Sequence, residues 1–328
     1  MTRALLALTA SLGAITLAAC SSQAEPEGAE TESAETQGAQ TQGIETQGPG
    51  AEPGWLTGVD LSELLNCARE QDVTLLQAHR AGDRPGAPEN SISASLASFS
   101  DGAVFTEIDV ARSSDGVLFL MHDDTLDRTT TGSGEFSGMT FQALSELFLV
   151  DVDGTQIDER VPTLADTLRA LDGVGIAQID RKRPTTFDEI ADVLEAEDAV
   201  DRSIVITYTI DDAIALHQRL PEVMISAGLR DMDDVQTLRD AGVDLTRIQA
   251  WLGLGSGNPE WDETLAGLEI ETSYGDFRAE QNGTIDYQLM ADNGAEVISV
   301  DDVLAAASTL DAYAEARAVL ANCPAARG

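Results

Sequence analysis

Thr163-Leu-Ala-Asp-Thr-Leu-Arg-Ala-Leu-Asp-Gly-Val-Gly-Ile-Ala-Gln-Ile-Asp180 is the stretch that decides the fold. It begins with the capping-box spacing of Thr163 and Asp166 followed by an amphipathic run, which predicts a helix. It ends in Gly175–Asp180, a short apolar run closed by a polar residue, which predicts a buried strand. A helix followed by a buried strand is the unit from which parallel sheets are built.

The same alternation runs through the rest of the chain. A second capping-box spacing at Thr186-Phe-Asp-Glu189 starts another helix. Residues 55–328 suit one α/β domain, and we expect a TIM-type (β/α)8 barrel. Since the candidate strands number nine, we expect one of the last few to lie outside the barrel. The candidates are Thr74–His79, Phe105–Val110, Val117–His122, Gly175–Asp180, Ile204–Thr209, Val223–Ala227, Arg247–Leu252, Leu268–Thr272 and Glu296–Val300.

A long insertion is expected after the third strand, over Asp124–Pro162. It is rich in Thr, Gly and Asp and contains a predicted short helix, Phe141–Phe148. An insertion of this size on a barrel is usually functional. Helices are also expected at Val59–Arg69 and Asp311–Leu320.

The first 54 residues do not belong to the fold. Residues 1–20 have a positive Arg3, an apolar stretch over Leu5–Leu17 and the ending Leu17-Ala-Ala-Cys20, which resembles the lipobox of bacterial lipoproteins. The alternative is a plain secretory signal in which Cys20 is incidental. Ser21 favours outer-membrane anchoring. The expected localisation is therefore the cell envelope or periplasm, with membrane contact only through the lipid.

Residues 21–54 predict a disordered acidic tether. They hold seven glutamates and no Lys, Arg or aromatic residue, with a repeat of the form Glu/Gln-Thr-Gln-Gly. Such a segment cannot bury enough apolar surface to offset its chain entropy.

The net charge of the chain is −39. Arg3 contributes +1 and the tether −7, which leaves −33 for the domain. This charge favours solubility and salt tolerance, and it excludes nucleic acid as a partner because no basic patch could neutralise phosphates. An anionic small-molecule substrate must therefore be held by local cations. We expect a monomer.

Cys67 and Cys323 lie near the two ends of the domain. A disulfide between them is plausible in an oxidising compartment, and a closed barrel brings its first and last elements together. Two buried free thiols are the alternative.

Lysine and histidine are scarce, with one lysine and three histidines in 328 residues. Lys182, His79 and His122 all lie beside apolar runs that end in polar residues. Barrel enzymes carry their chemistry at such strand ends. His217 lies in the helical run Asp211–Leu220 with no motif around it, and we assign it no role.

Carboxylates repeat the same placement. Glu107 and Asp109 are two residues apart on one strand, so their side chains point to one side. Two inward carboxylates repel each other unless a cation lies between them. Asp180, two residues before Lys182, could complete a site for Ca²⁺ or Mg²⁺. The alternatives are a solvent-facing edge strand for the first pair and a simple ion pair for the second.

His79 and His122 could act as an acid/base pair, since imidazole titrates near neutral pH. Arg80 adds a fork of donors suited to phosphate oxygens.

Over Thr74 to about Leu171, with an extension to the fourth strand, the chain resembles the glycerophosphodiester phosphodiesterase family. Any one of its motifs is weak, but five in order over about a hundred residues are specific. The five motifs are Ala78-His79-Arg80, Pro88-Glu89-Asn90, Glu107-Ile-Asp109, Ser114-Asp-Gly116 leading to His122-Asp123, and Leu126-Asp-Arg128-Thr-Thr with Gly132 and Gly134. Two further segments, Val161-Pro-Thr-Leu164 and Asp180-x-Lys182, extend the match to the fourth strand.

The resemblance implies a TIM-type barrel with an insertion after the third strand. It also implies metal-dependent hydrolysis of glycerophosphodiesters to glycerol 3-phosphate and an alcohol. The implied residues are Glu107, Asp109 and Asp180 on one divalent metal, His79 and His122 as the catalytic pair, Arg80 and Lys182 on the phosphate, and Glu89 in support.

The chain departs from the family pattern in four places. Ala81 replaces a glycine, Asp180 replaces a glutamate, Glu271-Thr-Ser-Tyr274 is a poor match to a late strand end, and a closing motif is reduced to Val300-Asp301-Asp302. The half that shapes the alcohol pocket is thus less well matched. Two alternatives stay open: a phospholipase D or sphingomyelinase D type of lipid phosphodiesterase, and a non-catalytic lipoprotein that binds phosphodiesters.

Overall fold

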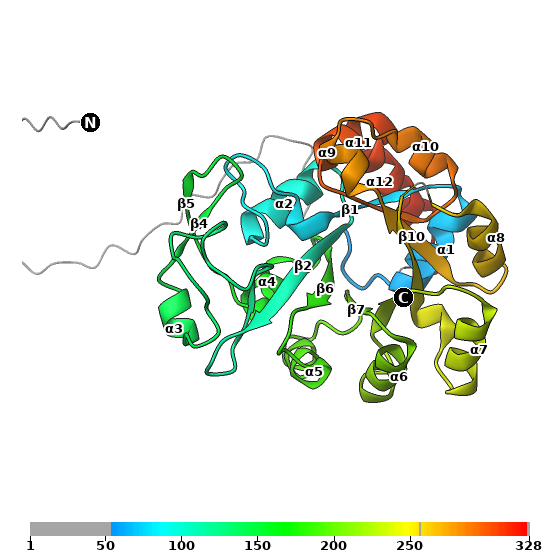
Figure 1. The fold of residues 1–328 in the computed structure, drawn as a ribbon. Helices are drawn as coiled ribbons and strands as arrows, with labels where there is room; N and C mark the ends of the chain where they lie inside the picture. The colour runs from blue at the N-terminus through cyan, green and yellow to red at the C-terminus, as the bar shows by residue number, and fades with distance from the viewer. Residues whose placement is uncertain (1–53, 256, 327–328) are drawn as a thin grey trace, which may run out of the picture. The chain divides into compact units, whose positions relative to one another are not determined.

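A closed barrel of eight parallel strands organises the domain (Figure 1). The computed structural model describes residues 54–255 and 257–326. The ring closes because β1 pairs in parallel with both β11 and β2. The predicted TIM-type barrel is therefore confirmed. Its strands are β1 (Leu75–Ala78), β2 (Phe105–Arg112), β6 (Ile176–Arg181), β7 (Ser203–Thr207), β8 (Met224–Ala227), β9 (Ile248–Leu254), β10 (Glu271–Gly275) and β11 (Val297–Val300).

The strand outside the barrel is the third candidate, not one of the last. β3 (Leu118–Leu120) runs antiparallel to β2, with Val110 opposite Leu120. Only a tight turn separates the two strands, with Gly116 at φ 87°. A parallel return would need a crossover of about a dozen residues, so the short connection dictates a hairpin. The expectation that a late strand falls outside the ring was wrong.

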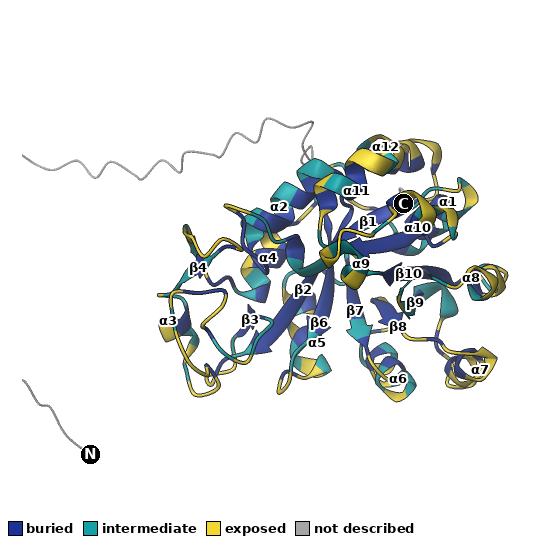
Figure 2. Ribbon diagram, turned by 45° about the horizontal axis from the view of Figure 1, so that its top comes forward, coloured by how far each residue is buried: buried dark blue, intermediate teal, exposed yellow. Residues whose placement is uncertain are grey.

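The insertion follows β3 and therefore lies between β2 and β6 along the chain, although these two strands pair directly in the barrel. It holds α3 (Phe141–Leu144) and a two-stranded sheet of β4 (Phe148–Val150) and β5 (Gln156–Arg160). Figures 1 and 2 show these elements together outside the ring of strands. The predicted helix is shorter than expected. It stops at Leu144, and Phe148 instead begins a strand whose pairing with Arg160 outweighs helix propensity.

Helices cover the outside of the barrel, with buried faces toward the strands and exposed faces toward solvent (Figure 2). α5 begins with the predicted capping box, since Thr186 and Glu189 bond each other's backbone N–H groups. Thr163 caps α4 by accepting the N–H of Asp166, but the Asp166 carboxylate accepts from the Thr163 hydroxyl and not from its backbone N–H, so the capping box is incomplete there. The helices are α1 (Leu61–Glu70), α2 (Ile92–Asp101), α4 (Leu164–Ala170), α5 (Phe187–Ala196), α6 (Ile210–Arg219), α7 (Met232–Asp240), α8 (Pro259–Ala266), α9 (Phe277–Gln281), α10 (Tyr287–Asp292), α11 (Val303–Leu310) and α12 (Ala312–Asn322).

The first and last helices close one end of the barrel. α1 and α12 contribute to an apolar cluster that includes Leu75, Phe105 and Val297 at the starts of their strands. A disulfide joins Cys67 of α1 to Cys323 directly after α12, with Cα atoms 6.0 Å apart. The two ends of the domain therefore support the same end of the core.

No helix within residues 54–255 and 257–326 combines the length and hydropathy needed to span a membrane. The expected signal segment, Cys20 and the acidic tether lie outside the described residues.

Candidate active site

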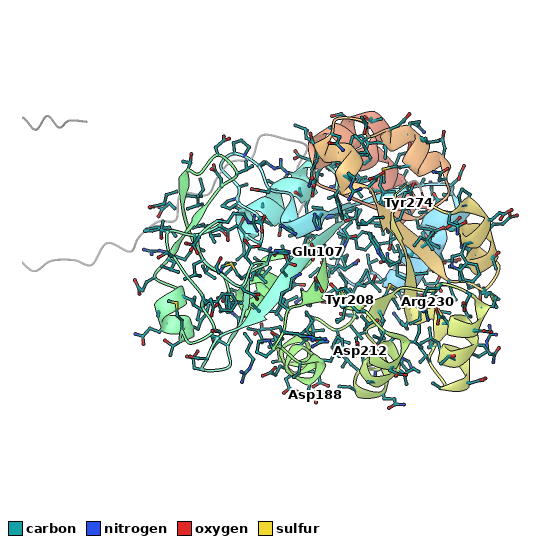
Figure 3. All side chains as sticks on the ribbon, viewed as in Figure 1. Glu107, Asp188, Tyr208, Asp212, Arg230 and Tyr274 are labelled. Carbon is teal, nitrogen blue, oxygen red and sulfur yellow. A yellow bond between two sulfur atoms is a disulfide. The ribbon has the colours of Figure 1, made fainter. Side chains whose placement is uncertain are left out.

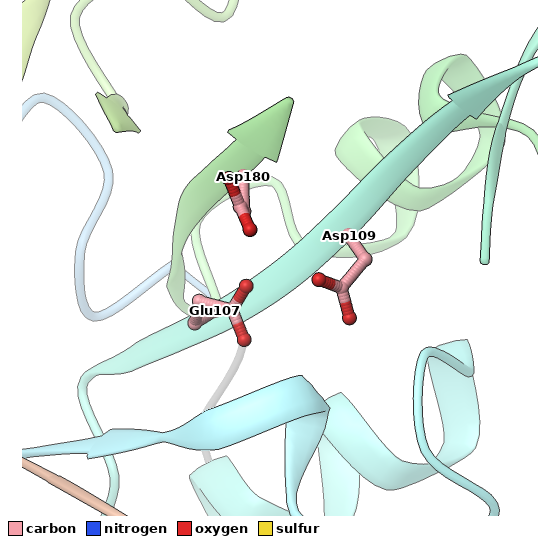
Figure 4. Close-up of side chains that lie close together, drawn as sticks. All are labelled: Glu107, Asp109 and Asp180. Atoms are coloured by element: carbon pink, nitrogen blue, oxygen red, sulfur yellow. The ribbon is translucent and has the colours of Figure 1, made fainter. Parts of the chain in front are cut away.

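Three carboxylates converge at the carboxyl ends of β2 and β6 (Figure 4). Glu107 and Asp109 lie two residues apart on β2, so their side chains share a face of the strand. Asp109 lies in register with Asp180 of β6. All three are buried, and each offers an oxygen within 4.8 Å of the others. The structure therefore brings together the three residues that the sequence nominated as metal ligands.

Donors from several elements surround these carboxylates. The Lys182 ammonium lies 2.7 Å from both Asp109 and Asp180. Asn90 donates its amide to Asp109 at 2.7 Å and accepts the Asp109 N–H at 2.8 Å. The Tyr208 hydroxyl donates to Asp180 at 2.7 Å. The orientation of the carboxylates is thus fixed by hydrogen bonds.

The cluster carries more negative charge than the protein compensates. Burial, with added repulsion from Asp109 and Asp180, raises the pKa of Glu107 well above its usual range. Burial alone would lower the pKa of Lys182, but its two aspartate partners raise it above the ordinary value. The lysine therefore stays charged. A second cation placed among the oxygens would restore Glu107 to its ionised form.

This donor set fits a hard divalent cation. Ca²⁺ and Mg²⁺ both take oxygen ligands, and three buried carboxylates with a raised glutamate pKa are a site that a cation would stabilise. Glu107, Asp109 and Asp180 are the side chains that would hold it.

His79 directly follows β1 and faces the same space. Its Nδ1 lies 2.7 Å from a carboxylate oxygen of Asp301, which follows β11. Its ring stacks on Phe277 of α9 with the centroids 4.0 Å apart. Because a carboxylate at Nδ1 favours the tautomer with its proton there, Nε2 is left as an acceptor.

His122 follows β3, at the start of the insertion, and does not line the cavity that His79 lines. Its Nδ1 contacts Asp123 at 2.7 Å, and its Nε2 contacts the Arg80 guanidinium at 2.7 Å. The arginine can only donate, so Nε2 of His122 is an acceptor here. His79 thus lines the cavity beside the carboxylates, whereas His122 is connected to them through Arg80, whose guanidinium lies 3.9 Å from Asp109.

Glu89 supports His122 through an ionic chain. Arg128 of the insertion bonds both oxygens of Glu89, at 2.5 and 2.8 Å, and also bonds Asp123. Arg128, with His122, lowers the pKa of Asp123 below its usual range. Asp123 therefore stays charged and holds the ring of His122. The insertion positions part of the site through this chain.

A turn with left-handed backbone conformation directly follows β1 and places Arg80 beside Glu107. Arg80, Ala81 and Gly82 have φ of 49°, 70° and 83°. The turn aims the Arg80 N–H at Glu107, 2.8 Å away. Gly82 is required, because a Cβ there would lie 2.5 Å from the Ser98 hydroxyl. Ala81 occupies a backbone conformation that L residues with a Cβ rarely adopt.

A cavity of about 320 Å³ opens beside the carboxylates. His79, Glu107 and Asp180 line it together with the aromatic residues Trp251 and Phe277. Glu107 and Tyr208 are both labelled in Figure 3, on β2 and directly after β7. The cavity provides room for a small ligand next to ionisable groups.

Sequence reasoning missed several residues of the site. The sequence indicates Asp301 only as part of a reduced motif, although its place at a strand end is a usable signal. The predicted strand Ile204–Thr209 includes Tyr208, but β7 ends at Thr207. The residues without a predicted role are Asn90, Asp123, Arg128, Tyr208, Trp251, Phe277 and Asp301.

Comparison with known proteins places these residues in a family context. Residues 79–235 match the model of the glycerophosphoryl diester phosphodiesterase family. Glycerophosphodiester phosphodiesterase 1 of Rattus norvegicus is 37% identical over 107 residues, which cover 32% of this chain and 32% of the relative. The chain thus spans about a third of the length of this curated relative.

Solved structures share the fold. A glycerophosphoryl diester phosphodiesterase from Parabacteroides distasonis superposes with a TM-score of 0.70 at 24% identity, over 79% of this chain and 94% of that one. An Oleispira antarctica phosphodiesterase in complex with the product sn-glycerol-3-phosphate has a TM-score of 0.57 at 19% identity, over 74% of this chain and 99% of that one.

Proposed function

Because the chain belongs to the glycerophosphoryl diester phosphodiesterase family, we propose that it hydrolyses glycerophosphodiesters to glycerol 3-phosphate and an alcohol. One observation carries the proposal. His79, Glu107 and Asp180 line one small cavity, and Asp109 and the only lysine of the chain lie directly beside these two carboxylates. The solved relative with bound sn-glycerol-3-phosphate supports the same product class.

The proposal includes one divalent metal, Ca²⁺ or Mg²⁺, held by Glu107, Asp109 and Asp180. When bound, such an ion withdraws charge from the phosphodiester oxygens. Lys182 and Arg80 then supply the positive charge for the remaining phosphate oxygens. Both side chains lie beside the carboxylates, and together they offset the −33 charge of the domain locally.

His79 is the proposed general base. Asp301 holds its Nδ1 proton, so Nε2 can take the proton of the attacking oxygen, either the glycerol 2-hydroxyl or a water. Attack by water expels the alcohol and gives glycerol 3-phosphate directly. Attack by the 2-hydroxyl expels the alcohol and leaves a cyclic glycerol phosphate, which a water must then open. The charge that develops on the ring is stabilised by the same aspartate.

His122 is the proposed general acid, which gives its Nε2 proton to the leaving alkoxide. In the structure, that nitrogen accepts from Arg80. The proposal therefore requires the guanidinium to turn to the phosphate when substrate binds, which frees Nε2 to carry a proton. Asp123 remains at Nδ1 throughout.

Turnover of glycerophosphocholine by the purified protein tests the proposal. We expect release of glycerol 3-phosphate with Ca²⁺ or Mg²⁺ and none with EDTA. Folded protein that releases nothing with either metal contradicts it.

A lipid phosphodiesterase of the phospholipase D or sphingomyelinase D type is the second candidate. Tyr208 and Leu254 at strand ends are 68% and 71% exposed and could contact acyl chains. The cavity is near the lower limit for ligand pockets, which favours a small diester over an intact lipid. Turnover of lysophospholipid or sphingomyelin in preference to glycerophosphocholine would reverse this order. A non-catalytic binding role would show metal binding without any turnover.

For the cellular setting we propose a monomeric lipoprotein. Its membrane contact would be a lipid on Cys20, with residues 21–54 as a tether and the outer membrane as the site of anchoring. The lipobox-like ending before Cys20 supports this. Cys20→Ala should release the protein from the membrane fraction, and retention of the variant there would contradict the proposal.

A further inference from the structure

The interior of the barrel changes from apolar to polar within two residues along several strands. Leu75, Ile176 and Met224 belong to the apolar cluster beneath α1 and α12. Two residues further along each strand, on the same face, lie Gln77, Gln178 and Ser226. All three line the cavity beside the carboxylates. These polar side chains therefore form its floor.

The floor holds amide groups without partners. Gln77 is 1% exposed, and neither its amide nitrogen nor its amide oxygen has a hydrogen-bond partner among the described residues. The amide oxygen of Gln178, 2% exposed, also lacks one. Leaving a buried polar group unsatisfied destabilises the fold. Both side chains also line an open cavity, and the unpartnered amides together with this cavity point to a ligand.

The chemistry of the floor selects the kind of group that fits it. A primary amide offers donors and an acceptor, which a hydroxyl can match in both directions. Gln77 and Gln178 are neutral, and Ser226 and Ser299 add hydroxyls to the same lining. Trp251 and Phe277 provide apolar surface for C–H groups. Adjacent hydroxyls on a short carbon chain meet all of these requirements.

We propose that this floor, with Gln77 and Gln178 as specificity-determining residues, binds the hydroxyl groups of a polyol part of the substrate. The inference rests on the proposed function, because the phosphodiester is placed by the carboxylate end of the same cavity. Two parts of a substrate could supply the hydroxyls. One is the glycerol attached to the phosphate, and the other is a polyol alcohol on its far side.

Substitution of Gln77 by leucine provides the test. Gln77→Leu keeps the approximate volume and removes the unpartnered amide, so the free energy of unfolding should stay equal or rise. A binding defect in this variant is then not a folding defect. Gln249→Leu is the matched control. Gln249 is 0% exposed and its amide is also without a partner, but it does not contribute to the described lining of the cavity.

Calorimetry with the full protein and Ca²⁺ measures the effect directly. We expect sn-glycerol 3-phosphate to bind about 10–100-fold more tightly than propyl phosphate, which lacks both hydroxyls, because unmatched amides cost about 1–3 kcal/mol. Gln77→Leu should lose most of this preference, and Gln249→Leu should keep it.

A second arm distinguishes the source of the hydroxyls. The KM values of glycerophosphoglycerol and glycerophosphoethanolamine are compared in the same variants. Suppose that the wild type binds glycerol 3-phosphate no more tightly than propyl phosphate, but Gln77→Leu raises the KM of glycerophosphoglycerol and not that of glycerophosphoethanolamine. The floor then binds the alcohol part of the substrate. The inference is overturned if the wild type prefers neither glycerol 3-phosphate over propyl phosphate nor glycerophosphoglycerol over glycerophosphoethanolamine. It is also overturned if both preferences survive in Gln77→Leu. Binding needs no turnover, so an inactive protein still gives an answer, and turnover without hydroxyl preference overturns this inference alone.

Discussion

Two buried acidic clusters lie at different levels of the same barrel. The mouth cluster is Glu107, Asp109 and Asp180; Glu107 and Asp180 line the cavity, and the cluster contacts Lys182 and the other donors described above. The sealed cluster, Asp262, Glu271 and Glu296, lies around the start of β10. Its partners are the Arg69 guanidinium, the Thr272 N–H at 2.6 Å and the Thr272 hydroxyl.

Both clusters consist of Asp and Glu, so the difference between a candidate metal site and a structural acidic cluster lies in their surroundings. Burial, with added repulsion from Asp262 and Glu271, raises the pKa of Glu296 to about 8. The sealed carboxyl is thus protonated at neutral pH and needs no cation. Its neighbours satisfy it within the fold. The mouth cluster has an ammonium, a cavity and a histidine beside it, and this combination supports metal binding and catalysis.

The largest expected effect concerns His79, which lines the cavity beside the mouth cluster. His79→Ala should lower kcat by about 10²- to 10⁴-fold, the usual range for a general acid or base. His217→Ala, on α6 outside the site, should change kcat less than twofold. Steady-state turnover of glycerophosphocholine measures both. Equal activity in His79→Ala and wild type would remove His79 from the mechanism.

The sealed cluster should instead control the pH dependence of stability. The folded pKa of Glu296, about 8, lies above the ordinary value of 4.5. Its contribution to the free energy of unfolding is therefore complete below pH 4.5 and lost as pH rises through 8, by an amount on the order of a few kcal/mol.

Glu296→Gln should flatten this slope, measured by urea unfolding between pH 5 and 9. Glu107 acts in the same direction without metal, so some slope should remain. An unchanged slope in the variant would show that Glu296 is ionised in the fold.

Asp301 extends the mouth cluster through its contact with His79. Asp301→Asn should lower kcat by about 10- to 100-fold with little change in KM, because the imidazole loses the partner that fixes its tautomer. The acid limb of the pH–rate profile should also move. Asp302→Asn is the control, since Asp302 caps α11 and asparagine caps equally well. Identical profiles for both variants would make Asp301 merely structural.

The smallest effect is expected at the turn beside Glu107. Ala81→Gly removes left-handed strain of about 1–2 kcal/mol but adds unfolded-state entropy of about 0.4–1 kcal/mol. The free energy of unfolding should rise by between about 0 and 1.6 kcal/mol, with kcat unchanged. Thermal unfolding measures the change. A clear loss of stability would mean that the buried methyl group of Ala81 matters more than its backbone.

The comparison also separates what the sequence could predict from what it could not. Glu107, Asp109 and Asp180 were predictable because spacing along a strand fixes the side to which side chains point. The sealed cluster was not, because Asp262 and Glu296 come together only through packing. The direction of β3 was missed although its connection to β2 is short enough to require a hairpin. Asp301 and His79 are 222 residues apart, and only the closed ring brings them together.

The most direct test is calorimetric titration of Ca²⁺ and Mg²⁺ into metal-stripped wild type, Asp180→Asn and Glu296→Gln. We expect one metal site in the wild type and in Glu296→Gln. Binding to Asp180→Asn should be at least about tenfold weaker, because this variant loses a carboxylate that would hold the metal. Undiminished binding in Asp180→Asn, or its loss in Glu296→Gln, would contradict the assignment of the metal to the mouth cluster.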